Sequence, residues 1–102
     1  MVATTDTIER ALVRLSTTEL MLGDLPEVAA EWDSLAEGER ASWSIEWDNE
    51  MAGLAQLSQM AACGVLTPDL YSRFRQLLAA LNDVAPILDR LNLSSPESIR
   101  NC

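Results

Sequence analysis

Apolar residues recur every three or four positions along most of the chain, which is the spacing of amphipathic helices. Thr5 or Asp6 can cap the start of a first helix, and Gly23 is placed to end it. The stripe between these signals contains one acid and consists of Ile8, Leu12, Leu15, Glu19 and Leu22. The pattern predicts a helix over residues 6–22.

Proline and glycine mark the next two helices. Pro26 suits the first turn of a short second helix over about residues 26–36, because the N–H that proline lacks has no partner there. Glu27 then lies near the positive end of the helix dipole. Gly38 separates this helix from the longest unbroken one, residues 39–63, for which Gly64 is a natural stop.

The strongest helix start is the segment Thr67-Pro68-Asp69, which supplies an N-cap, a proline and a first-turn acid. The fourth helix continues to about Asn92, with an apolar face formed by Leu70, Phe74, Leu77, Leu81, Val84, Ala85 and Leu88. Pro86 removes one backbone hydrogen bond, which predicts a kink or break near Asp83.

No stretch alternates apolar and polar residues with the β-branched enrichment of a strand. The sequence therefore predicts an all-α fold, a small antiparallel helical bundle of about four helices, three long and one short. Residues 1–93 form a single domain in this interpretation, and residues 94–102 form a flexible C-terminal tail. Pairing of two protomers would bury the wide apolar faces better, so a homodimer is a further expectation.

Composition narrows the chemistry. The 102 residues include no histidine, and all seven basic residues are arginines. The commonest general base, the commonest transition-metal ligand and any lysine nucleophile are therefore missing, and we expect no enzymatic activity and no cofactor. The chain shows no basic and apolar leader and no run long enough to cross a bilayer, which favours a cytoplasmic protein without membrane contact. Cys63 lies in an apolar helical context that is typical of a small buried residue.

The net charge of −9 is concentrated in one quarter of the chain. Residues 24–50 contain nine of the 16 acids, only Arg40 as a base, and all the tryptophans, Trp32, Trp43 and Trp47. Direct nucleic-acid binding needs a basic face, so this distribution favours a basic protein partner instead. The alternative is that the acids form a solvated helix face while the tryptophans point into the core.

Two glutamates lie inside apolar stripes. Glu50 falls on the same helix face as Trp43 and Trp47, and Glu19 occupies the matching place in the first helix. A buried carboxylate needs a partner, and Arg73 is the best candidate for a structural ion pair with Glu19 or Glu50. Alternatively, each glutamate lies at the rim of its stripe and faces solvent or a partner protein.

A metal site is a third interpretation of the inward acids. Glu19, Glu46 and Glu50 could supply oxygen ligands to Mg²⁺ or Mn²⁺. The di-iron pattern of helical bundles, however, requires a Glu-x-x-His motif, which a chain without histidine lacks.

The leading hypothesis is a non-enzymatic interaction module of antitoxin, immunity, adaptor or decoy type. Its partner-binding residues would be the aromatic anchors and adjacent carboxylates, Trp32, Trp43, Glu46, Trp47 and Glu50. The alternatives are a divalent-cation-binding bundle or Mg/Mn-dependent hydrolase that uses the inward glutamates, and a structural homo-oligomer whose charge serves solubility.

Overall fold

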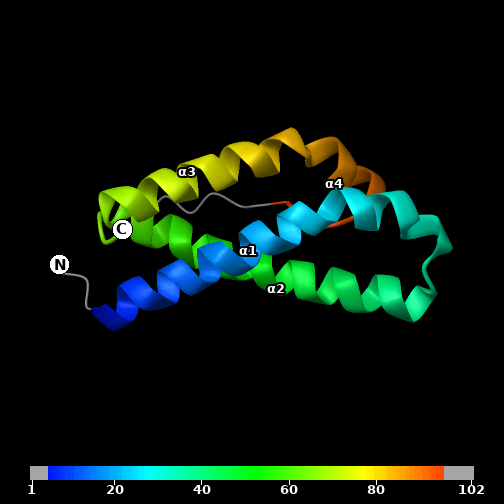
Figure 1. Ribbon diagram of the computed structural model, residues 1–102, viewed down its shortest axis with the longest axis horizontal. Helices are drawn as coiled ribbons and strands as arrows, with labels where there is room; N and C mark the ends of the chain where they lie inside the picture. Colours follow the sequence, from blue (N-terminus) through cyan, green and yellow to red (C-terminus); the bar gives the residue numbers. More distant parts are fainter. Residues whose placement is uncertain (1–4, 96–102) are drawn as a thin grey trace.

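The chain folds into helices connected by short turns. The structure, a computed structural model, describes residues 5–95, and no strand occurs in that range (Figure 1). In chain order the elements are α1 (Thr5–Glu31), the 3₁₀ helix η1 (Trp32–Ser34), α2 (Glu37–Ala62), α3 (Pro68–Asp83) and α4 (Ala85–Leu91). The all-α prediction is confirmed.

The helices α1, α2 and α3 run along the length of an elongated molecule of 48 × 23 × 20 Å (Figure 1). α1 packs against both α2 and α3, and α4 turns back from the end of α3. The α1–α2 turn and the α3–α4 turn therefore lie at one end of the molecule, while the start of α1 and the α2–α3 turn lie at the other. No helix within residues 5–95 combines the length and apolar character needed to cross a bilayer.

The first two predicted helices are wrong in their boundaries. α1 continues through both Gly23 and Pro26, and what was predicted as a second helix is the end of α1 followed by η1. The physical reason is burial: Leu25 and Ala29 continue the core-facing stripe beyond Gly23, so packing outweighs the local helix-breaking preferences. The chain turns instead at Trp32–Ser34.

The helix start and stop signals after residue 62 lie where the sequence predicts them. The hydroxyl of Thr67 accepts a hydrogen bond from the Leu70 N–H at 3.3 Å, which caps α3. Gly64 follows α2 with φ of +72°, a conformation that costs glycine little. The helix predicted to be interrupted by Pro86 is divided at Val84, and the left-handed residue Asn92 ends α4.

Trp47 is the largest side chain that the core buries completely. Its indole Nε1 donates a hydrogen bond to the Ser94 carbonyl at 2.8 Å, and the Ser94 hydroxyl donates to Asp48 Oδ1 at 2.6 Å. Leu93 is buried beside them. The first residue of the predicted tail is thus held against α2, while residues 96–102 lie outside the described range.

The environment of Cys63 differs from the one predicted from the sequence. This residue is half-buried immediately after α2 and is disulfide-bonded, whereas the sequence pattern indicated a small buried residue. A cytoplasmic location stays a prediction.

Two glycines provide a matched test of the corrected helix boundary. Gly23→Ala should raise the free energy of unfolding by about 0.5–1 kcal/mol, because α1 is continuous there and a Cβ would meet no atom of the described chain within 4 Å. Gly64→Ala should lower it by about 1–2 kcal/mol, because φ is positive. Urea denaturation measures both, and destabilisation by Gly23→Ala would contradict a continuous α1.

Trp47 should contribute far more to stability than an exposed apolar residue on the same helix. Trp47→Ala removes a fully buried indole, and we expect it to cost about 3–5 kcal/mol. Ile45→Ala, at a side chain that is 61% exposed, should change stability by about 0.5 kcal/mol or less. Equal effects of the two substitutions in thermal unfolding would show that Trp47 is not in the core.

Candidate functional site

The three tryptophans differ in accessibility. Trp47 is 0% exposed, so it cannot serve as a surface anchor, and this part of the predicted partner-binding set is corrected. Trp43 is half-buried and stacks on Trp47, with ring centroids 5.4 Å apart and planes 14° from parallel. Trp32 is half-buried in η1. The spacing of four residues places Trp43 and Trp47 on the face of α2 that also buries Leu54, which explains their burial.

Exposed carboxylates gather where α1 passes through η1 into α2. We call this region the acidic end; it consists of Asp24, Glu27, Glu31, Asp33, Glu37 and Glu39, all of them exposed. Arg40 is half-buried nearby, and the guanidinium of Arg90 donates to the Ala29 carbonyl at 3.1 Å rather than to a carboxylate. The acidic end therefore keeps most of its negative charge.

Arg73 of α3 forms an ion pair with Glu19 of α1. The same guanidinium donates to the Ser16 hydroxyl at 3.4 Å, so one arginine bonds two successive turns of α1. The arginine and glutamate side chains are 35% and 39% exposed, which places the pair at the edge of the core. This contact links α1 to α3, and Glu50 takes no part in it.

The three glutamates considered as metal ligands are not brought together. Glu19 is bound to Arg73, Glu46 is exposed, and Glu50 faces α1. No group of three potential metal-ligating side chains occurs in the described part of the chain. The geometry therefore gives no support to a metal centre at these positions.

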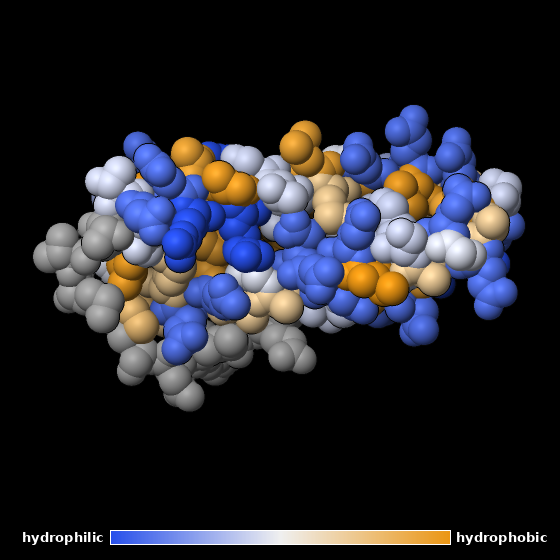
Figure 2. Space-filling view, turned by 90° about the horizontal axis from the view of Figure 1, so that it is seen from below, coloured by the Kyte–Doolittle hydropathy of each residue, from blue (hydrophilic) through white to orange (hydrophobic). Residues whose placement is uncertain are grey.

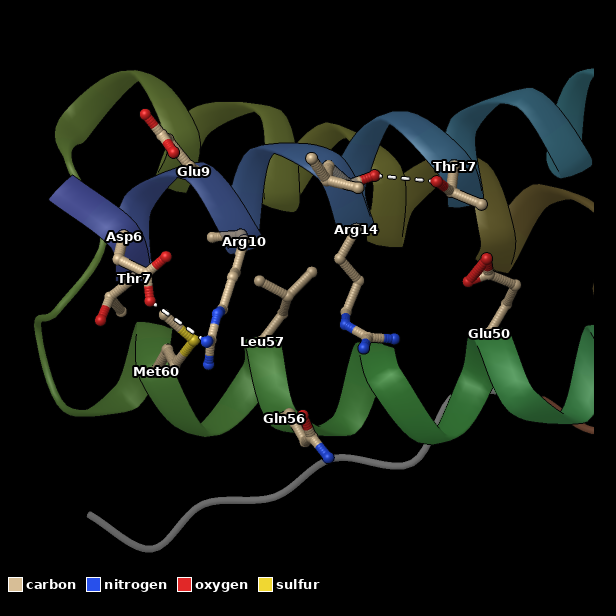
Figure 3. Close-up of a pocket in the computed structure, with 12 residues that line it drawn as sticks. Asp6, Thr7, Glu9, Arg10, Arg14, Thr17, Glu50, Gln56, Leu57 and Met60 are labelled. Atoms are coloured by element: carbon tan, nitrogen blue, oxygen red, sulfur yellow. Dashed lines mark hydrogen bonds and ion pairs between the residues drawn. The ribbon is translucent and has the colours of Figure 1, made fainter.

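A groove of about 730 Å³ lies between the first half of α1 and the second half of α2 (Figure 3). We call it the α1/α2 groove; its lining combines charged, polar and apolar side chains, namely Asp6, Thr7, Glu9, Arg10, Ala11, Val13, Arg14, Thr17, Glu50, Gln56, Leu57 and Met60. In the space-filling view, the most hydrophilic atoms lie beside hydrophobic ones toward the end where α1 begins (Figure 2). The groove is therefore amphipathic.

Arg14 lies across the groove against the backbone of α2 at Gly53. A Cβ built at Gly53 would be 1.5 Å from Nη1 of Arg14, so only glycine leaves room for the guanidinium in this position. Glycine inside a helix costs about 0.5–1 kcal/mol relative to alanine. The helical periodicity did not predict this contact, although an isolated glycine within a long amphipathic helix is a signal of close approach by another group.

Glu50 lines the same groove from α2 (Figure 3). It is half-buried, as Arg14 is, and neither side chain has a hydrogen bond or ion pair to another residue within residues 5–95. The α1/α2 groove thus holds two opposite charges that do not neutralise one another directly.

No family model matches this chain, and comparisons with curated proteins and with solved structures also give no match. We therefore infer a function from the geometry and charge of the chain itself.

The Glu19–Arg73 contact should be a modest, salt-sensitive link. In a double-mutant cycle with Glu19→Gln and Arg73→Gln, we expect a coupling energy of about 1 kcal/mol or less, because both side chains are partly solvated. The coupling should decrease as salt is added. Urea denaturation at two ionic strengths measures it, and a salt-independent coupling well above this value would indicate a fully desolvated pair instead.

Proposed function

We propose that the protein is a non-enzymatic interaction module whose acidic end binds a basic surface of a partner protein. Roles of antitoxin, immunity, adaptor or decoy type all use such a surface. The helices would form an antiparallel bundle that serves as a rigid scaffold, with the chemistry of recognition carried by carboxylates.

The observation that supports this proposal most strongly is the segregation of charge. All six carboxylates of the acidic end are exposed, and they project from consecutive elements around a single turn. Like charges held this close repel one another and oppose compaction. A basic partner would remove this repulsion and would be steered toward the acidic end at long range.

Two tryptophans add apolar surface beside these carboxylates. Trp32 lies in η1, within the acidic end, and Trp43 lies two turns into α2. Both are half-buried, so each keeps a fixed edge for contact at little entropic cost. Glu46 is exposed one turn beyond Trp43 and extends the surface. Trp47 contributes only by holding Trp43 in place.

The homodimer stays a prediction. Exposed apolar side chains remain on the outward side of α1, at Leu12, Val13 and Leu20. A second copy of the chain could cover them without obstructing the acidic end.

A matched pair of charge variants tests the proposal. Glu27→Gln, Glu31→Gln and Glu37→Gln together neutralise half of the acidic end, whereas Asp6→Asn, Glu9→Gln and Asp69→Asn remove the same charge elsewhere. Tagged wild type and both variants are incubated with native lysate, washed at increasing salt, and the bound proteins are identified by mass. We expect a stoichiometric basic protein on the wild type and on the second variant, and its loss from the first.

The salt dependence of capture provides a second test of binding through the acidic end. Because the Debye length is about 8 Å at physiological salt and shorter at high salt, contacts made by exposed charges must weaken as salt rises. Equal capture by both variants, or capture that is indifferent to salt, would contradict binding through the acidic end. Circular dichroism of each variant confirms that the helices are intact.

A further inference from the structure

The α1/α2 groove lies away from the acidic end and contains an arrangement that protein binding at that end does not use. Arg14 and Glu50 are both half-buried on its walls, and neither is paired to another side chain in the described range. Taking charged groups partly out of water without a partner is unfavourable, so a ligand that pairs with both would be stabilised.

Both Arg14 and Glu50 have their positions defined relative to α2. The guanidinium of Arg14 occupies the place where a Gly53 side chain would be, and Glu50 lies three residues earlier on the same helix. Positions three residues apart present their Cβ atoms about 5–6 Å from one another. No direct ion pair joins Arg14 and Glu50 within the described residues, and both side chains line the same groove (Figure 3). A carboxylate and an ammonium on one carbon have the complementary charges.

Part of the lining of the groove is apolar. Ala11, Leu57 and Met60 contribute apolar atoms to it, and Figure 3 shows Leu57 and Met60 on α2 between Arg14 and the start of α1. A volume of about 730 Å³ is of the order that small-molecule sites have. These side chains would receive an aliphatic or aromatic side chain attached to the same carbon as the two charges.

The net charge of the protein also selects the ligand. A simple carboxylate would be repelled by a chain of charge −9 and by Glu9 and Glu50 in the groove. The other charged groups at the groove, Asp6 and Arg10, are paired to each other at 3.2 Å. A ligand with no net charge avoids the repulsion and still satisfies both Arg14 and Glu50.

We propose that the α1/α2 groove binds a free amino acid with an apolar side chain, whose carboxylate pairs with Arg14 and whose ammonium pairs with Glu50. Gly53 has a positioning role, because it lets the guanidinium lie flat against α2. Binding at this groove is independent of partner binding at the acidic end.

The test is a titration of ¹⁵N-labelled protein with L-leucine, leucine amide and N-acetyl-leucine, followed by amide chemical shifts. We expect saturable shifts around Arg14 and Glu50 with leucine. The amide lacks the carboxylate and the acetyl derivative lacks the ammonium, so each should bind about tenfold or more weakly. Absence of saturation at millimolar leucine, or equal binding of the three compounds, would overturn the proposal.

Variants separate recognition from folding. Arg14→Gln and Glu50→Gln should each weaken leucine binding by about tenfold or more, whereas Arg75→Gln, at an exposed arginine of α3 outside the groove, should leave it unchanged. Gly53→Ala keeps every charge and favours the helix, but it displaces Arg14 and should weaken binding as well. Equal effects of Arg75→Gln and Arg14→Gln, or full binding by Gly53→Ala, would contradict the assigned geometry.

Discussion

Burial of Trp47 is the constraint on which the rest of the structure depends. Its indole is completely buried in the core, stacks on the ring of Trp43, and donates a hydrogen bond to the backbone carbonyl of Ser94. These contacts determine how α2 is rotated about its axis. With Trp47 directed inward, Gly53 and Glu50 must lie at the side of α2 that meets α1. The acids of the first turn of α2, Glu37 and Glu39, are exposed.

The molecule therefore separates its charges into two arrangements with different physical character. At the acidic end the carboxylates are exposed, close together and little neutralised, which suits recognition at long range. In the α1/α2 groove, Arg14 and Glu50 are each partly desolvated and opposite in sign, which suits recognition at contact distance. A third charged contact has a structural role: Arg73 bonds Glu19 and Ser16 and so links α1 to α3.

Local signals predicted the helix boundaries wherever tertiary contacts agreed with them. Thr67 with Pro68 starts α3 as expected, and Gly64 follows the end of α2. Gly23 and Pro26 failed as boundaries because Leu25 and Ala29 continue the buried face of α1. Packing of this continued stripe against the rest of the core offsets the local helix-breaking preferences of Gly23 and Pro26.

By itself, the sequence determined the all-α class, the position of the acidic end and the absence of histidine and lysine chemistry, because composition and helical periodicity are local properties. Only the tertiary structure decided that Trp47 is core, that Arg73 bonds Glu19, and that Arg14 lies on Gly53. Each of these depends on which helix faces are brought together, and residues far apart in the chain meet only after packing has fixed the rotation of every helix.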